Sequence, residues 1–98
     1  MQAKILVLCK HEGIRETILR LLGNNADWQA AGTNNIADAK KMLESDNFDI
    51  ALLGNGFTEA EETEITEFVT QHSPGTKTVY HYGGGSGLLS AEIYQALV

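Results

Sequence analysis

Four short apolar runs, separated by amphipathic segments, limit what this chain folds into more than any other feature. The runs are KILVLC at residues 4–9, WQAAG at 28–32, FDIALL at 48–53 and KTVYHY at 77–82. Nearly continuous apolar runs of this length are typical of strands buried on both faces of a parallel sheet. Parallel strands need a crossover between them, and each intervening segment has room for one helix. The sequence therefore predicts a strand–helix unit repeated four times.

The spacing of apolar residues between the runs predicts the helices. The inner faces of the first two consist of Ile14, Ile18, Leu21 and Leu22, and of Ile36, Ala39, Met42 and Leu43. Asn34 or Asn35 caps the second helix. Thr58 and Glu61 have the spacing of a capping box, which predicts a third helix that ends near residue 71. The last helix is expected at residues 88–97.

Right-handed crossovers distribute such helices over both faces of the sheet. We therefore expect an α/β fold, a three-layer flavodoxin-like sandwich with a four-stranded parallel sheet in the order 2-1-3-4. Residues 1–98 are expected to form one domain, because a chain of this length builds one hydrophobic core. A ligand site in this fold would lie at the carboxyl ends of the strands, near residues 9–13, 54–57 and 82–87.

The composition argues against two classes of partner. The formal net charge is -6, and the seven basic residues are scattered, so we expect no nucleic-acid partner. The apolar runs are much shorter than the roughly 20 residues that cross a bilayer, so we expect no membrane partner. The single cysteine, Cys9, cannot form an internal disulfide, and no secretory signal core is visible. These features are typical of a cytoplasmic protein.

Two stretches resemble the response-regulator receiver domain. KILVLCKHEGIRETILRLL is similar to the first strand and helix of that family, and GTNNIADAKKMLESDNFDIALLG to its second helix and third strand. TKTVYHYG resembles the fourth strand more weakly. The resemblance covers roughly the first 55 residues and consists of a pattern of apolar positions.

The residues that carry receiver chemistry are missing. The resemblance implies an acidic pair that holds Mg²⁺ after the first strand, a phosphoacceptor Asp after the third and a Ser or Thr after the fourth. In this chain Cys9 and Lys10 stand in place of the acidic pair. Gly54 stands in place of the phosphoacceptor Asp, and Tyr82 in place of the Ser or Thr. No Lys follows Lys77, so the final strand with its Lys, and the helix before it, are expected to be deleted. The chain is thus expected to be a truncated, degenerate receiver, or pseudo-receiver, with no metal site and no cofactor.

Lys10 allows two interpretations. Its ammonium group could occupy the empty metal position as a fixed positive charge, or it could be an ordinary solvated loop lysine. Asp49 is not a substitute acceptor, because it precedes its strand and lies at the opposite end of the sheet.

Cys9 supports an alternative function. Sugar phosphotransferase B components of the lactose and cellobiose type are similar in size, and they carry a phosphorylated Cys at the end of their first strand. The resemblance implies that Cys9 is the nucleophile of a phosphoryl carrier, with Lys10, His11 and Arg15 attracting the phosphoryl group. Glu12 would repel it. The simpler interpretation is that Cys9 is a small buried residue that ends a strand.

Two further features have weaker functional interpretations. A glycine-rich run is either an anion-binding loop for a small ligand or a flexible connection where an element was lost. It consists of Gly83, Gly84, Gly85, Ser86 and Gly87. His11, Glu12 and His81 form too sparse a set for a metal site. His81 is expected to face the less buried side of the sheet.

The fourth strand is predicted to be a sheet edge, because no fifth strand follows it. Together with the last helix it would present an interface, whose expected members are Tyr80, Tyr82, Leu88, Leu89, Ile93, Tyr94 and Leu97. We expect this surface to bind a protein partner or a second copy, giving a homodimer. Binding within a signalling or regulatory system is therefore the predicted function, and catalysis is not expected.

Overall fold

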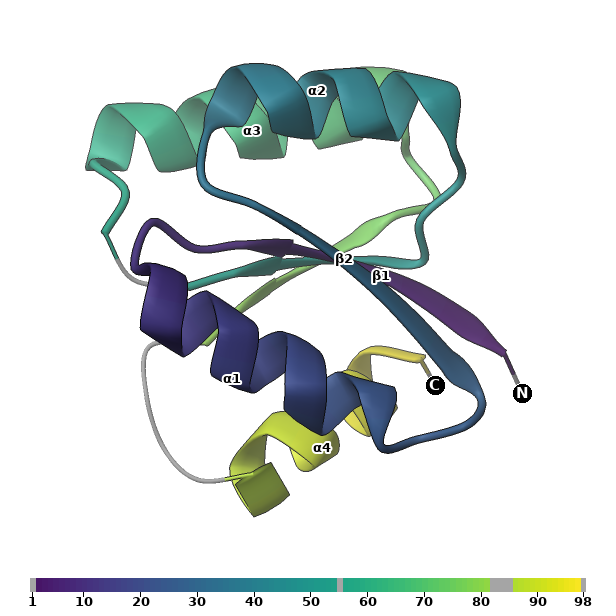
Figure 1. The fold of residues 1–98 in the computed structure, drawn as a ribbon. Helices are drawn as coiled ribbons and strands as arrows, with labels where there is room; N and C mark the ends of the chain where they lie inside the picture. The colour runs from purple at the N-terminus through teal and green to yellow at the C-terminus, as the bar shows by residue number, and fades with distance from the viewer. Residues whose placement is uncertain (1, 55, 82–85, 98) are drawn as a thin grey trace.

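Strands and helices alternate along the whole described chain (Figure 1). The computed structural model describes residues 2–54, 56–81 and 86–97, with side chains at positions 2–54, 56–81 and 91–97. The elements are β1 (Ala3–Leu8), α1 (Glu12–Gly23), β2 (Trp28–Thr33), α2 (Ile36–Ser45), β3 (Ile50–Leu53), α3 (Glu59–His72), β4 (Lys77–Tyr80) and α4 (Ser86–Leu97). This is the alternation that the apolar runs predict.

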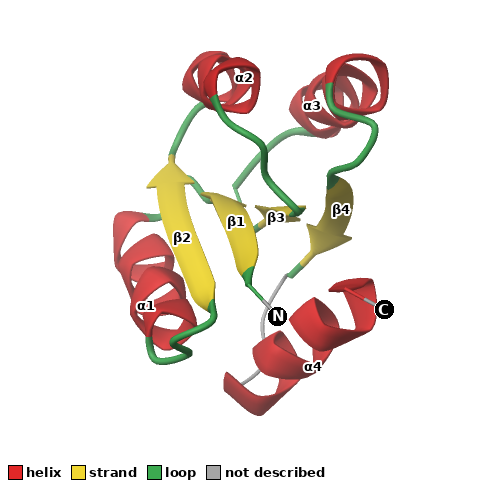
Figure 2. Ribbon diagram, turned by 90° about the vertical axis from the view of Figure 1, so that its right-hand side faces the viewer, coloured by secondary structure: helices red, strands yellow, loops and turns green. Residues whose placement is uncertain are grey.

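The described strands form one sheet in the order β2-β1-β3-β4. Every neighbouring pair is parallel. Helices α1 and α4 cover one face and helices α2 and α3 the other, so the domain has three layers (Figure 2). The predicted flavodoxin-like fold and its strand order are confirmed.

Alternate side chains of β1 enter two separate hydrophobic cores. Ile5 and Val7 pack with α1, and their cluster includes Ile93 of α4. Leu6 and Leu8 pack in the second cluster, with α2 and α3. A central strand buried on both faces favours apolar residues at successive positions, which explains the apolar run from Ile5 to Cys9.

Side-chain caps fix where three helices begin. The ring nitrogen Nδ1 of His11 accepts a hydrogen bond of 3.1 Å from the Ile14 N–H at the start of α1. Asn35, the second of the two predicted caps, begins α2 by accepting from the Asp38 N–H. The capping box predicted before α3 is present.

The last strand is shorter than its sequence predicts. β4 ends at Tyr80, although the His81 N–H still donates to the Leu53 carbonyl at 2.8 Å. His81 is only 8% exposed, so the prediction that it faces the less buried side of the sheet is wrong. A glutamate on α4 supplies the polar partner that makes burial of this imidazole tolerable.

The last helix begins earlier than predicted. It starts at Ser86, so Ser86 and Gly87 are helical and not part of a loop. Tyr82, Gly83, Gly84 and Gly85 lie outside the described residues. No helix in the described part of the chain is long and apolar enough to cross a membrane.

Ile93 tests how α4 contributes to the fold. Its side chain is fully buried in the core between α4 and the sheet. We expect Ile93→Ala to lower the free energy of unfolding by about 2–5 kcal/mol, because it removes buried methyl groups and leaves a cavity. Urea denaturation measures this loss. The exposed neighbour Gln95 is the control, and Gln95→Ala should change stability by less than about 0.5 kcal/mol. Equal effects of both variants would contradict this packing.

Candidate functional site at the carboxyl ends of the strands

The residues that the sequence resemblance assigns to the receiver site meet at the carboxyl ends of β1 and β3. Cys9 follows β1, and its N–H donates to the Thr33 carbonyl at 3.1 Å. Gly54 follows β3, and its N–H donates to the Leu8 carbonyl at 2.7 Å. Both residues thus extend the hydrogen bonding of the sheet by one position, which holds their backbones in place.

The Cys9 side chain fills the space beside Gly54. Cys9 is 0% exposed, and its thiol donates a weak hydrogen bond of 3.6 Å to the His11 carbonyl. A Cβ atom at position 54 would lie 3.2 Å from both the Cβ and the Sγ of Cys9, and 3.4 Å from the Leu8 oxygen. These separations are tighter than ordinary van der Waals contact. A side chain at position 54 therefore requires Cys9 to move.

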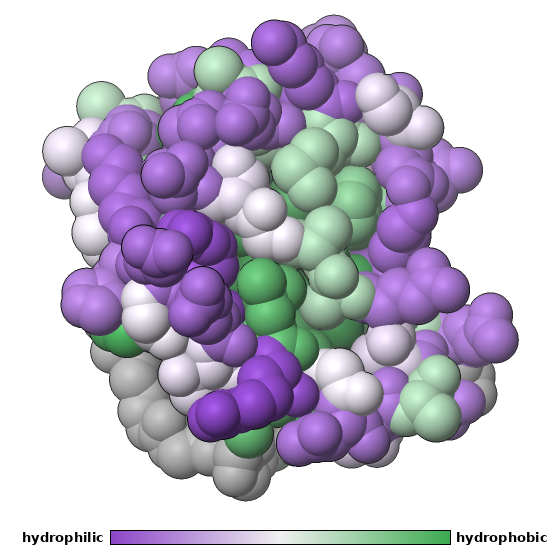
Figure 3. Space-filling view, viewed as in Figure 1, coloured by the Kyte–Doolittle hydropathy of each residue, from purple (hydrophilic) through white to green (hydrophobic). Residues whose placement is uncertain are grey.

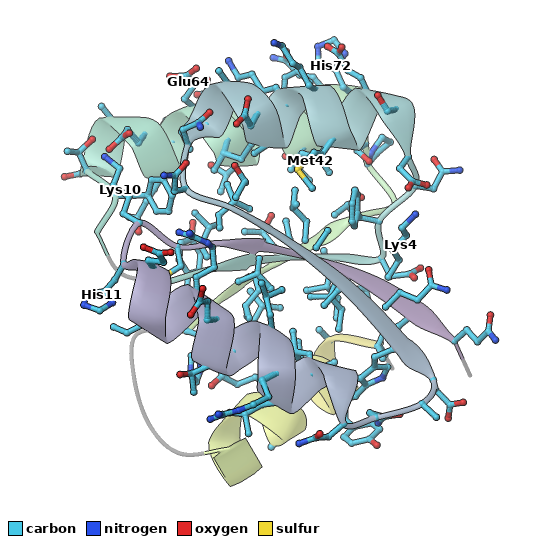
Figure 4. The ribbon with its side chains drawn as sticks, in the orientation of Figure 1. Lys4, Lys10, His11, Met42, Glu64 and His72 are labelled. Atoms are coloured by element: carbon cyan, nitrogen blue, oxygen red, sulfur yellow. The ribbon has the colours of Figure 1, made fainter. Side chains whose placement is uncertain are left out.

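Lys10 reaches from the β1–α1 loop to the start of α3 (Figure 4). Its Nζ donates to the Glu61 Oε1 at 2.9 Å. The same ammonium lies 5.4 Å from the centre of the Phe57 ring, which is within the range of a cation–π contact. Gly56 has a φ of 105°, and a Cβ there would lie 2.8 Å from the Lys10 Cβ. Glycine at position 56 is what allows Lys10 to approach this loop.

Glu61 joins this ion pair to the capping box of α3. Its Oε1 accepts from the Thr58 N–H at 3.0 Å, and the Glu61 N–H donates to the Thr58 hydroxyl at 3.2 Å. The hydrogen bond from the Thr58 backbone lowers the pKa of the Glu61 carboxyl, and the bond from Lys10 lowers it further. The sequence predicts the capping box, whereas the ion pair with Lys10 joins residues 51 positions apart and has no signal in the spacing.

The other basic residues near Cys9 have structural contacts of their own. Arg15 donates from Nη1 to the Cys9 carbonyl at 2.9 Å, and His11 caps α1. The phosphoryl-carrier alternative needs an accessible thiolate in an electropositive setting. The burial of Cys9 gives that alternative no support.

The residues that the sequence resemblance assigns to the receiver metal site do not fit Mg²⁺. This ion prefers oxygen ligands, mainly carboxylates and water. The position here offers a thiol at Cys9, a cation at Lys10 and a glycine at residue 54. In residues 2–54, 56–81 and 86–97, no three His, Cys, Asp or Glu side chains form a group that could hold a metal ion.

A second polar contact lies where β4 meets α4. The Nδ1 of His81 is 2.8 Å from the Glu92 Oε1, and both side chains are mostly shielded from solvent. Sequence reasoning considered His81 only as a weak metal ligand and did not consider Glu92. The spacing of 11 residues carries no motif that could have identified the pair.

The structure separates the residues of the predicted interface. Tyr80 is 44% exposed at the carboxyl end of β4. Tyr94 is 56% exposed, but its ring lies 5.1 Å from that of Trp28, and its hydroxyl accepts from Asn25 at 3.0 Å. Trp28 begins β2, at the opposite edge and opposite end of the sheet from Tyr80. The two tyrosines therefore do not share one surface.

Ile93 is fully buried and contributes to the core, so the prediction that it belongs to the interface is wrong. Leu97 is a half-buried residue that packs against the same core. The side chains of Leu88 and Leu89, like that of Tyr82, lie outside the described part of the chain.

No protein-family model matches this sequence, and no curated protein matches it. Its structure does match solved proteins. The response regulator TrrA from Thermotoga maritima, solved in complex with Mg²⁺–BeF, superposes with a TM-score of 0.82 and 16% identity, over 98% of this chain and 99% of its own. A CheY-like receiver domain protein from Methanospirillum hungatei gives a TM-score of 0.74 with 20% identity, over 98% and 76%. The chain has the receiver fold.

Another match is the receiver domain of the response regulator NarL from Mycobacterium tuberculosis. Its TM-score is 0.70 with 21% identity, and the match covers 98% of this chain and 76% of that one. At these identities the similarity establishes the fold, while the function has to be argued from the site.

The burial of Cys9 predicts slow thiol chemistry. Because the side chain is excluded from solvent, a thiol reagent such as 5,5′-dithiobis(2-nitrobenzoate) reaches it only after the core opens. We expect labelling of the native protein to be at least about a hundredfold slower than in urea, since such opening costs several kcal/mol. Absorbance of the released thiolate follows the reaction. Cys9→Ser is the blank, and equal rates in buffer and in urea would show an accessible thiol.

The lowered pKa of Glu61 predicts a pH-dependent contribution to stability. The pKa of the Glu61 carboxyl is lower in the folded protein than its unfolded value of about 4.5. The ionised carboxyl therefore stabilises the fold at a pH above that unfolded value, and this stabilisation is lost as the pH falls through the folded-state pKa. The urea midpoint of Glu61→Gln should therefore lie below that of the wild type at neutral pH, and the gap should close on acidification. Glu67→Gln, a matched change at an exposed position of α3, should show no such closing gap. A gap independent of pH would contradict the role of the charge.

Proposed function

We propose that this chain is a receiver-like signalling module that acts by contact with proteins and does not accept a phosphoryl group. The observation that carries this proposal is the contact between Cys9 and Gly54. The receiver resemblance assigns the phosphoacceptor carboxylate to position 54, and a Cβ at that position would lie only 3.2 Å from the Cβ and Sγ of Cys9. The receiver fold supports a signalling role, and the missing carboxylates support one without phosphorylation.

Lys10 has a defined role in this proposal. Its ammonium group bridges the β1–α1 loop and the capping box of α3. This cation is part of the chain, so the contact does not depend on a bound ion. The pair is exposed to solvent, which screens it, so it biases the position of the loop only weakly.

The proposal assigns a protein partner and no cofactor, metal or nucleic acid. On β4, the predicted interface residue Tyr80 is exposed, and tyrosine suits such a surface because it offers apolar area and a hydroxyl together. The net charge of -6 supports the exclusion of nucleic acid. The proposed location is the cytoplasm, because the single cysteine cannot form an internal disulfide of the kind found in secreted proteins.

Intact mass spectrometry tests the absence of phosphoryl transfer. The protein is incubated with acetyl phosphate and Mg²⁺, and separately with phosphoenolpyruvate and the general phosphotransferase proteins. We expect no mass increase under either condition, because no carboxylate occupies position 54 and the Cys9 thiol is buried.

Two controls make the result specific. A phosphorylatable receiver domain treated in parallel shows that the donor is active. Cys9→Ser separates the remaining outcomes. A phosphoryl adduct that disappears in this variant would make the chain a carrier, and one that persists would place an acceptor elsewhere. Either adduct would overturn the proposed function.

A further inference from the structure

The two edges of the sheet differ in how they are protected. β2 forms one edge, and among the described strands it pairs only with β1. Its sequence, WQAAGT, contains no charged residue and no proline, which are the residues that commonly block an edge from pairing. β4 forms the other edge, is shorter and begins with Lys77. β2 is therefore the less protected of the two edges.

Alternate residues of β2 direct their backbone groups away from the sheet. The Cys9 N–H, at the end of β1, donates to the Thr33 carbonyl, so the odd-numbered residues of β2 hydrogen-bond to β1. In a parallel ladder the even-numbered residues then direct their N–H and carbonyl groups outward. The backbone groups of Ala30 and Gly32 thus line the outer edge, with the spacing that another strand matches.

Helix α1 determines what kind of strand fits this edge. A Cβ at Gly32 would lie 2.9 Å from the Leu19 Cδ1 and 3.2 Å from the Arg15 Cδ, so these two α1 side chains reach the edge. Gly32 itself is exposed. If the edge bound the same edge of a second copy, the α1 helix of that copy would have to lie where this α1 packs on β2. An extended segment without such a helix avoids this conflict.

Apolar side chains border the edge on both faces of the sheet (Figure 3). Leu19 and Ala30 extend the core that contains α1 toward the surface. Ala31 and Met42 extend the core that contains α2, and Met42 points from α2 toward the sheet (Figure 4). All four residues are half-buried, and polar side chains surround them. An apolar patch with a polar rim is typical of a protein interface.

Arg15 adds a positive charge near the carboxyl end of β2. Its Nη1 donates to the Cys9 carbonyl at 2.9 Å, which holds the guanidinium at this end of the sheet. Among the side chains that the structure describes, no carboxylate forms an ion pair with Arg15. A guanidinium has five N–H donors, so it has donors for a carboxylate on an incoming strand as well as for the Cys9 carbonyl.

We propose that the β2 edge binds an extended segment of a partner protein, which adds a strand to the sheet outside β2. The segment exchanges hydrogen bonds with the backbone of Ala30 and Gly32. It presents apolar side chains to Leu19 and Met42 and carries a carboxylate beside Arg15. In such strand addition the backbone bonds give affinity and the side-chain contacts give specificity. The inference rests on the proposed function, because it names the kind of protein partner and the surface that binds it.

Selection from a phage-displayed library of random linear peptides tests the proposal on the full chain. We expect the enriched peptides to share an apolar, strand-forming pattern with one carboxylate. An enriched peptide is then added to the protein while amide hydrogen exchange is followed by NMR. It should slow exchange at Ala30 and Gly32 at least about tenfold, because their N–H groups become hydrogen-bonded. Thr78, whose N–H points outward from β4, should be unaffected. A selection that enriches no peptide, or protection confined to other residues, would overturn the proposal.

Variants at the two edges locate the binding by affinity. Ala30→Pro removes an outward N–H and no hydrogen bond to β1, so it should weaken binding of the enriched peptide about tenfold. Thr78→Pro is the matched change at the β4 edge and should leave the affinity unchanged. The reverse result, with binding lost in Thr78→Pro and kept in Ala30→Pro, would place the peptide on the wrong edge.

Arg15→Gln keeps the test decisive if Ala30→Pro does not fold. The wild type should bind the enriched peptide more tightly than a version in which glutamine replaces the carboxylate residue. Arg15→Gln should remove this preference, and a preference that persists would contradict the role of the guanidinium. A chain that binds no peptide and gains no phosphoryl group would overturn this inference alone, whereas a phosphoryl adduct would overturn the proposed function.

Discussion

The burial of β1 on both faces is the constraint on which the rest of this structure depends. β1 lies between β2 and β3, and its side chains from Ile5 to Leu8 have no exposed surface. Each fully buried aliphatic side chain stabilises the fold by about 1.5–3 kcal/mol, so this strand holds the two helical layers to one sheet. The burial continues one residue further, to Cys9. The chain therefore leaves the sheet through a small apolar residue, at the point where a receiver resemblance would place an acid.

This burial determines the chemistry of the neighbouring positions. A carboxylate at position 9 would need its own hydrogen bonds or a cation, because burying an unpaired charge is very costly. Cys9 avoids that cost and occupies the space against Gly54. The first charged side chain of the loop is Lys10, which lies at the surface and pairs with Glu61. The buried thiol at position 9 and the ion pair of Lys10 thus belong to one packing arrangement.

Local signals in the sequence predicted the local structure well. The capping box at Thr58 and Glu61 and the strand–helix alternation depend on residues close in the chain, and both are present. The strand order was predicted as the flavodoxin-like order for a chain of alternating strands and helices, and it is confirmed. Contacts between distant residues were missed. Lys10 and Glu61, or His81 and Glu92, meet only after the sheet has formed, and no spacing between them encodes the contact.

Ile93 shows a related difficulty. From the sequence alone, an apolar residue on an amphipathic helix is compatible with a hydrophobic core and with an interface. The packing of α4 against the sheet assigns Ile93 to the core. The β2 edge is the opposite case. Alanine and glycine are poor strand formers, so WQAAG is a weak strand signal in the sequence. The close packing of α1 nevertheless requires small residues there. Gly32 is nevertheless exposed, because β2 lies at an edge of the described sheet. A glycine there thus serves the packing of the helix and not the stability of the strand.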